Sequence, residues 1–212
     1  MKTLFVRPCH DDVVAYLHHY SKSLVKESRK RAVSTIDKEK KQANKDIVTE
    51  IIIKKDPSFI MFNGHGSPDA IAGHNDEIII SSDKNSDILK NRITYALSCS
   101  SAAGLGKRVA DKHTTFIGYT DEFALGMDVN CQSSIQKDKR AKLFLEPSNT
   151  LVRALLKGNS AEEAVIKAKR VMKENISNLK TDSAPDAKDY IPFLFNNYLI
   201  LDIKGNAQAS LK

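Results

Sequence analysis

Two short apolar runs that each lead into a reactive side chain constrain the fold of this chain most strongly. The first run, residues 59–62, is followed closely by His65, and the second, residues 93–97, by Cys99. Continuous apolar runs of this length, bounded by Gly, Ser and Asn, are typical of strands in a parallel sheet covered on both faces. Ligands bind at the carboxyl edge of such sheets. If the two strands are neighbours, an imidazole and a thiol meet at that edge.

The rest of the chain alternates between strand-like and helix-like patterns. Strands are predicted at 4–6, 32–36, 59–63, 77–80, 93–97, 114–119 and 193–203. Helices are predicted at 12–25, 38–55, 86–89, 101–110, 149–156 and 160–179. Residues 127–142 have no clear period and are interpreted as a long surface loop. The strand at 77–80 is expected to form a small hairpin beside the loop that carries His65. The other strands, about five or six, alternate with helices and indicate an α/β fold of parallel βαβ units with helices on both faces.

Length and composition favour one domain. The 212 residues, of which 41% are hydrophobic, suffice for one well-buried α/β domain and are few for two. We expect a single domain over residues 1–205 and a disordered tail over 206–212. No apolar stretch reaches the roughly 18 residues that a membrane span needs, and the start of the chain lacks the apolar core of a signal peptide. The sequence therefore predicts a cytoplasmic protein without membrane contact.

The cysteines and histidines do not suggest a metal centre. Cys9, Cys99 and Cys131 form no CxxC pair and leave an odd count, which argues against a disulfide framework and a structural zinc site. The histidines other than His65 are scattered along the chain: His10, His18, His19, His74 and His113. No metal ligands are predicted, and no cofactor is expected.

Most of the net charge of +7 arises in residues 22–45, which hold nine basic and three acidic side chains. Such a segment can attract nucleic acid or an acidic partner. It has no interleaved aromatic residues and falls on the exposed faces of two predicted helices. A solvated surface is therefore favoured over a nucleic-acid site.

His65 and Cys99 together suggest nucleophilic catalysis. A free cysteine, with a pKa of about 8.5, is only a few per cent thiolate at neutral pH, and a nearby imidazole removes that limit. Cys99 also precedes a predicted helix, whose N-terminal amides favour an anion. The amides of Cys99 and Gly66 are candidate donors to an oxyanion. Taken singly, each side chain is better explained by a structural role, but the pair favours a catalytic dyad.

Asp11 and Asp12 are candidate substrate-binding residues. They follow the first predicted strand and therefore lie at the same sheet edge as the dyad. A carboxylate in a desolvated pocket discriminates strongly for Lys or Arg. The two residues serve equally well as the cap of the helix that follows.

An apolar strand ending in His-Gly, then a second ending in a small residue plus Cys, resembles the caspase-like cysteine peptidases, which include caspases, gingipains, clostripain, legumain and separase. The Asn-Gly-His-Gly-Ser segment at 63–67 is closer to gingipains than to caspases. The resemblance implies a three-layer α/β/α sandwich with about six strands, the last antiparallel. It also implies His65 as base and acid, Cys99 as nucleophile, and no third catalytic residue.

Two departures from the family pattern limit the specificity that it implies. Caspases have Gln-Ala-Cys at the nucleophile, where this chain has Leu97-Ser98-Cys99, and the acid that clostripain carries two residues before its Cys is here Leu97. Cleavage after Asp is therefore not supported.

The leading hypothesis is a cytoplasmic cysteine endopeptidase acting on proteins or peptides, with a preference for Lys or Arg and with regulation by a partner or by self-cleavage after Lys139 or Arg140. One alternative is a catalytically inactive caspase-like binding or scaffold module. Another is a flavodoxin-like domain that binds a small molecule.

Overall fold

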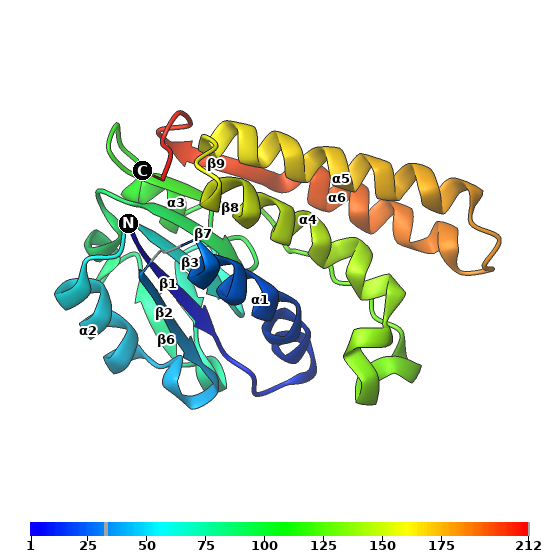
Figure 1. Cartoon of the computed structure of the whole chain (residues 1–212), viewed down its shortest axis with the longest axis horizontal. Helices are drawn as coiled ribbons and strands as arrows, with labels where there is room; N and C mark the ends of the chain where they lie inside the picture. The colour runs from blue at the N-terminus through cyan, green and yellow to red at the C-terminus, as the bar shows by residue number, and fades with distance from the viewer. Residues whose placement is uncertain (32–33, 212) are drawn as a thin grey trace.

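The computed structural model describes residues 1–31 and 34–211. Its centre is a six-stranded sheet with the order β2-β1-β3-β7-β8-β9 (Figure 1). The strands are β1 (Lys2–Arg7), β2 (Ser34–Glu39), β3 (Phe59–Asn63), β7 (Ile93–Leu97), β8 (Thr115–Tyr119) and β9 (Leu201–Gly205). Neighbouring strands pair in parallel, except that β9 runs antiparallel to β8. The predicted α/β fold with an antiparallel last strand is confirmed.

Helices cover both faces of the sheet. One face packs against α1 (Asp12–Lys30), α4 (Lys139–Leu156) and α5 (Ala161–Thr181), and the other against α2 (Lys45–Lys55) and α3 (Leu105–Val109). Successive side chains of a strand point to opposite faces. In β1, accordingly, Phe5 lies in the first core and Leu4 in the second. Because both faces are buried, these strands are continuously apolar in sequence.

A smaller antiparallel sheet stands beside the loop that carries His65. It consists of β4 (Gly66–Ser67), β5 (Ala70–Ala72) and β6 (Ile78–Ser81). The short helices between elements are η1 (Lys40–Gln42), η2 (His74–Asp76), η3 (Ser86–Leu89), η4 (Val129–Lys137) and η5 (Ala187–Tyr190). The prediction of a hairpin next to the His loop is confirmed.

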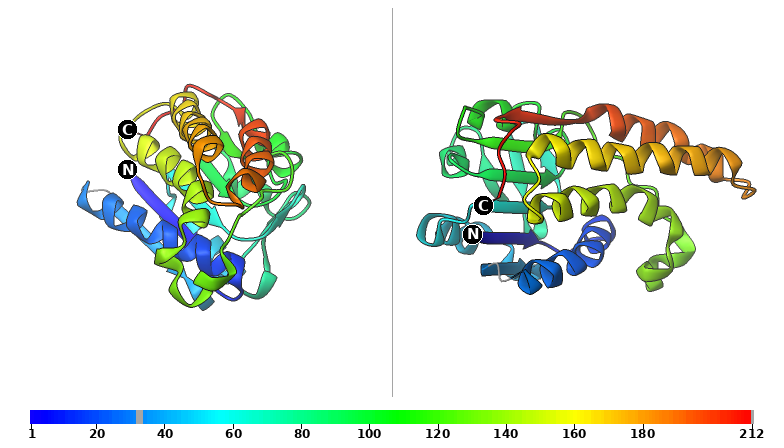
Figure 2. Two further views of the ribbon diagram at one scale, coloured as in Figure 1. Left: turned by 90° about the vertical axis from the view of Figure 1, so that its right-hand side faces the viewer. Right: turned by 45° about the horizontal axis from the view of Figure 1, so that its top comes forward.

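The predicted strand at 193–203 is wrong in its first part. Residues Ile191–Ile200 form helix α6, which packs along α5 and continues directly into β9. Pro192 stands in the first turn of α6, where its missing N–H costs nothing. Figures 1 and 2 show α5 and α6 side by side, extending beyond the sheet.

The predicted loop at 127–142 is also wrong in part, because it contains η4 and the first turn of α4. Asp138 caps that turn by accepting a hydrogen bond from the amide of Ala141. Arg140 forms ion pairs with Asp182 and Asp186. A protease binds its substrate as an extended chain. Cleavage after residue 139 or 140 would therefore require this turn to unfold.

Two further segments differ from the predictions. The segment 38–55 divides into the end of β2, η1 and α2 rather than one helix. Positions 32–33 of the predicted strand 32–36 lie outside the described residues, and the observed strand starts at Ser34.

The tail predicted to be disordered returns to the domain. The amide of Ala161 donates to the carbonyl of Ala209 at 2.9 Å, and Leu211 joins the core. Position 212 lies outside the described residues. None of the helices in the described part of the chain combines the length and apolar character that crossing a bilayer requires.

Candidate active site

His65 and Cys99 lie at the same edge of the large sheet. Strands β3 and β7 are adjacent and parallel, with Asn63 paired to Leu97. His65 and Cys99 each follow two residues after this last pair. The amide of Gly64 donates to the carbonyl of Leu97 at 3.3 Å, so that the two chains stay together beyond the strands.

Gly66 brings the His loop into contact with the Cys loop. A Cβ atom at this position would lie 2.8 Å from the Cβ of Ser98 and 2.9 Å from the carbonyl oxygen of Cys99. Both distances are shorter than ordinary contacts, so any larger residue would push the loops apart. The glycine next to His65 therefore allows the two loops to approach this closely.

The turn after Cys99 is held by the end of β8. The amide of Ser100 donates to the carbonyl of Asp121, and that of Ala102 donates to the carbonyl of Tyr119, both at 3.0 Å. Ser100 has a φ of +55°. Helix α3 begins only at Leu105, so the prediction that Cys99 stands at a helix N-terminus is wrong. Within the described residues, no hydrogen bond occupies the amide of Cys99.

The Cys99 thiol is half-buried and lies in an acidic setting. Its sulfur is 4.0 Å from the carbonyl oxygen of Phe123. Burial raises the pKa of the thiol, and the charges of Glu122 and Asp121 raise that pKa further. In the part of the chain described by the structure, no hydrogen bond joins the thiol to His65. The protein therefore favours the neutral thiol until a base approaches it.

This setting predicts a pH effect. Because the pKa of Cys99 is raised, its alkylation by a small haloacetamide should increase with pH through a midpoint above that of a free cysteine. The double variant Asp121→Asn/Glu122→Gln should move this midpoint down by roughly 0.5 pH unit, since two like charges are removed. Asp111→Asn, before β8 at the opposite sheet edge, should leave the midpoint unchanged. An unshifted midpoint in the double variant would exclude these carboxylates as a cause.

His65 is held by a carboxylate that the sequence did not assign to it. Its Nε2 atom lies 2.7 Å from Oδ2 of Asp11, and the side chains of the two residues are 41% and 37% exposed. Burial alone would raise the pKa of Asp11, but the Val14 amide and the His65 imidazole outweigh it and leave that pKa below its ordinary value. The carboxylate of Asp11 is therefore ionised beside the ring.

The predicted substrate-binding pair has other contacts. Oδ1 of Asp11 caps α1 by accepting from the amide of Val14 at 2.9 Å, while Oδ2 faces His65. Both oxygens of Asp11 are thus engaged inside the chain. Asp12 is exposed, and its Oδ2 lies 3.3 Å from Nε2 of Gln132.

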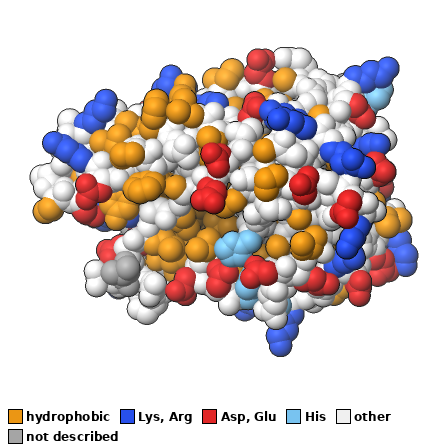
Figure 3. All heavy atoms as spheres, turned by 180° about the vertical axis from the view of Figure 1, so that it is seen from behind, with side chains coloured by type: hydrophobic (Ala, Val, Ile, Leu, Met, Phe, Trp, Pro, Cys, Tyr) orange, Lys and Arg blue, Asp and Glu red, His pale blue; other side chains and the backbone are white. Residues whose placement is uncertain are grey.

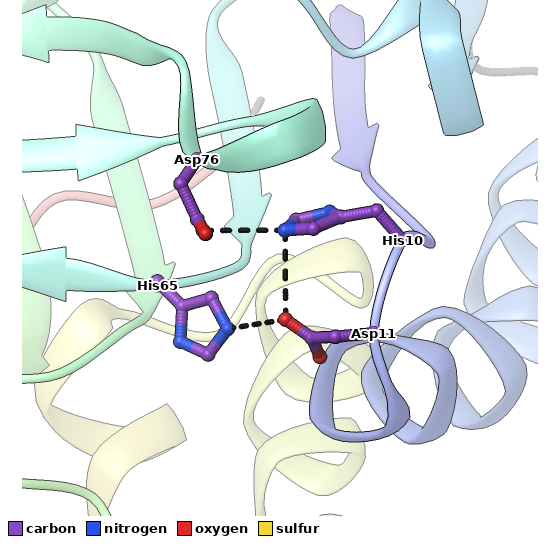
Figure 4. Close-up of side chains that lie close together, drawn as sticks. All are labelled: His10, Asp11, His65 and Asp76. Carbon is purple, nitrogen blue, oxygen red and sulfur yellow. Dashed lines mark hydrogen bonds and ion pairs between the residues drawn. The ribbon is translucent and has the colours of Figure 1, made fainter.

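Two further side chains join His65 and Asp11 (Figure 4). Nε2 of His10 lies 3.5 Å from Oδ2 of Asp11 and 3.2 Å from Oδ1 of Asp76. The ring of His74 packs edge-on against that of His10, with centroids 5.4 Å apart. The prediction of scattered histidines is wrong for this region. Figure 3, a view from behind the face seen in Figure 1, shows histidine side chains bordered by acidic ones.

A cavity of about 410 Å³ begins one residue from Phe123, the residue whose carbonyl faces the thiol. It is lined by residues 124–126, by Tyr190 and Phe193, and by two carboxylates, Asp186 and Asp189. Asp186 pairs with Arg140 at 2.7 Å. Asp189 takes part in no ion pair with another described residue. Asp189 is exposed and lines the cavity with no cationic partner among the described residues.

Comparison with known proteins relates the fold to cysteine proteinases. No protein-family model matches the chain, and neither does any curated protein. Among solved structures, the Arg-specific cysteine proteinase gingipain R (RgpB) is similar, with a TM-score of 0.64 and 9% identity over 100% of this chain and 47% of that one. The complex of the Porphyromonas gingivalis RgpB pro- and mature domains gives a TM-score of 0.63, also at 9% identity, over 100% of this chain and 48% of that chain.

This likeness shows the fold alone. The chain spans about half the length of the solved chains it matches. Its mixed sheet and covering helices are those of the caspase-like α/β fold, as the sequence resemblance implied.

Proposed function

We propose that the protein is a cysteine peptidase that uses Cys99 as nucleophile and His65 as general base and acid. The observation that carries this proposal is the position of the two side chains, each two residues beyond the last pair of neighbouring parallel strands. The gap between their loops is set by Gly66. A thiol and an imidazole at one open sheet edge supply the two groups that acyl transfer through a thioester requires.

In the proposed reaction, His65 removes the proton from Cys99 as the sulfur attacks the substrate carbonyl. The C–S bond forms, and the oxyanion accepts hydrogen bonds from the amides of Cys99 and Gly66. Collapse breaks the C–N bond, and the imidazolium gives its proton to the leaving amine. Water then hydrolyses the thioester with His65 again as base. The raised pKa of Cys99 means that proton transfer accompanies attack rather than preceding it.

The proposal is tested by incubation of the protein with a peptide library beside its Cys99→Ala variant. Cleavage in the first sample alone supports a cysteine peptidase. The alternative, an inactive binding module of the same fold, is favoured by the neutral thiol and by the contact of His65 with Asp11 instead of Cys99. That alternative predicts that no peptide is cut by either protein.

Asp11 orients His65 in this proposal. Asn at position 11 can still cap α1, but it removes the charge that faces the ring. Asp11→Asn is expected to lower kcat/KM by about 10–100-fold, less than for a buried pair because this one is part-exposed. The melting temperature should barely change. Enzyme kinetics and thermal unfolding of Asp11→Asn check both expectations. Asp46→Asn, in the first turn of α2, is the matched control. Unchanged kinetics would limit Asp11 to capping.

The acidic cavity next to Phe123 supports a preference for Lys or Arg before the scissile bond. Asp189 offers an unpaired carboxylate there, and Tyr190 and Phe193 offer apolar walls for the aliphatic stem. Asp189→Asn should lower kcat/KM for lysyl and arginyl substrates by about 10–100-fold and leave alanyl substrates unaffected. A library preference for Asp or for large aliphatic residues would remove this assignment.

Regulation by a protein partner also remains part of the proposal. RgpB forms a complex of its pro- and mature domains. A partner that covers the sheet edge of this chain would block access to Cys99.

A further inference from the structure

Four side chains with metal-ligating atoms converge beside the candidate active site. His10, Asp11, His65 and Asp76 each direct one nitrogen or oxygen toward a common point, and these four atoms all lie within 4.8 Å of one another (Figure 4). They come from three separate segments: the β1–α1 connection, the β3–β4 connection and η2. Sequence spacing alone does not relate these segments.

The ligand spacing fits a small tetrahedral ion. Zinc binds His nitrogen and Asp oxygen at about 2.0–2.2 Å, so the ligand atoms of a tetrahedral site are about 3.4 Å apart. The Nε2 atom of His10 is already 3.5 Å from Asp11 and 3.2 Å from Asp76. The pair of His65 and Asp11, at 2.7 Å, has to open slightly. His65 is part-exposed in a loop, which permits this adjustment.

The charges of the four side chains also fit a divalent metal ion. Two carboxylates and two neutral imidazoles balance a divalent ion. Calcium and magnesium prefer oxygen ligands, whereas a mixed nitrogen and oxygen set favours zinc and its neighbours. Among the residues that the structure describes, no Lys or Arg neutralises Asp11 or Asp76 by an ion pair.

His10 provides an independent observation. Its side chain is only 9% exposed, its Nε2 atom faces both carboxylates, and its buried Nδ1 atom has no hydrogen-bond partner. A buried imidazole needs partners for its ring nitrogens, and Nε2 is the His10 nitrogen that faces both carboxylates. A metal ion bound by Nε2 and by the two carboxylates would give this nitrogen a strong partner. The alternative is a His10 ring that contacts the two carboxylates with no ion between them.

An ion can reach the cluster from solvent. A hollow of about 350 Å³ is lined by His65, Asp76, Ala70, Ala72 and Ile78. Two of these lining residues, His65 and Asp76, belong to the four-residue cluster.

We propose that His10, Asp11, His65 and Asp76 bind one divalent transition-metal ion, with Zn²⁺ the best fit. The bound ion holds Nε2 of His65 and displaces its hydrogen bond with Asp11. A consequence, which rests on the proposed function, is that Zn²⁺ inhibits the peptidase because His65 is immobilised away from Cys99.

Binding is measured in the Cys99→Ala background, where the nearby thiol cannot bind the ion. The full chain is titrated with Zn²⁺ in competition with a chromophoric chelator. We expect one ion per chain, bound at least 10-fold more weakly by Asp76→Asn and by His10→Gln. Asp76 is exposed, so its variant keeps the test valid if His10→Gln fails to fold. His113→Gln, an exposed histidine, is the matched control and should bind as tightly as the Cys99→Ala background.

Histidine ring NMR signals provide a second measurement. Zn²⁺ should shift the signals of His10 and His65 and leave that of His113 in place. The proposal is overturned if Asp76→Asn and His10→Gln, each made in the Cys99→Ala background, bind Zn²⁺ as tightly as that background does. This conclusion holds whether or not the protein cleaves peptides. Specific binding without any peptide hydrolysis leaves the metal site in place and removes the proposed function instead.

Discussion

Replacement of Cys99 by alanine is expected to lower kcat/KM for peptide hydrolysis at least about 1,000-fold, because Cys99 supplies the sulfur of the proposed thioester. The fold should survive. Cys99 is half-buried at the sheet edge, and loss of one sulfur atom there opens little space. We expect the melting temperature to stay within a few degrees of the parent value.

The other two cysteines serve as matched controls. Cys9 and Cys131 are also free and partly buried, but neither lies at the end of β7. Cys9→Ala and Cys131→Ala should retain most of the activity. Substantial turnover by Cys99→Ala, on a substrate that the parent cleaves, would show that the nucleophile has been assigned incorrectly.

The largest expected effect on stability comes from Arg7, at the end of β1. Its guanidinium contacts both carboxylate oxygens of Asp37, at 2.8 and 2.7 Å, and also Glu39 and the carbonyl of His18. The Arg7 side chain is 2% exposed and that of Asp37 is 12% exposed. Arg7→Met would leave the buried Asp37 charge unpaired. We therefore expect the free energy of unfolding to fall by about 3–5 kcal/mol.

Urea denaturation measures this loss, and a double variant identifies its cause. If the cost arises from the unpaired carboxylate, Arg7→Met/Asp37→Asn should recover much of the stability. Lys54→Met removes an exposed partner of Glu50 and should cost less than about 1 kcal/mol. A similar small cost for Arg7→Met would mean that the Arg7–Asp37 pair does not stabilise the end of β1.

The central strands were predictable because their signals are local. Strands β3 and β7 are buried on both faces, so their side chains are continuously apolar and their ends are marked by Gly or Ser. Once such strands are placed side by side, the positions of His65 and Cys99 follow. Helix α6 was not predictable in this way, because Phe193, Phe195 and Leu199 are exposed on it and its apolar sequence imitates a buried strand.

The start of α4 was missed for the opposite reason. Its exposed basic residues conceal a helical stripe of buried Ala141, Phe144 and Leu145. Its cap, Asp138, is also fixed by a hydrogen bond from Tyr16, which lies 122 residues earlier in the sequence. Contacts over such separations leave no pattern in a single sequence.

The contact between Asp11 and His65 was only partly predictable from the sequence. The residues are 54 positions apart, and Asp11 is fully explained in sequence as the cap of α1. The adjacency of β1 and β3 was the available signal, because a residue that follows β1 then lies at the same edge as His65. His10 and Asp76 depend in addition on the fold of η2, where Asn75 and Asp76 take left-handed φ values of 54° and 58°.

Time-dependent labelling by a peptidyl ketone electrophile tests the central claim most directly, because it requires both a nucleophilic thiol and a base but no complete turnover. Intact-mass and peptide mapping should show one adduct per chain, on Cys99, with a rate reduced at least about 100-fold in His65→Ala. Equal labelling rates in the parent and His65→Ala, or adducts shared evenly among Cys9, Cys99 and Cys131, would contradict a Cys99–His65 dyad.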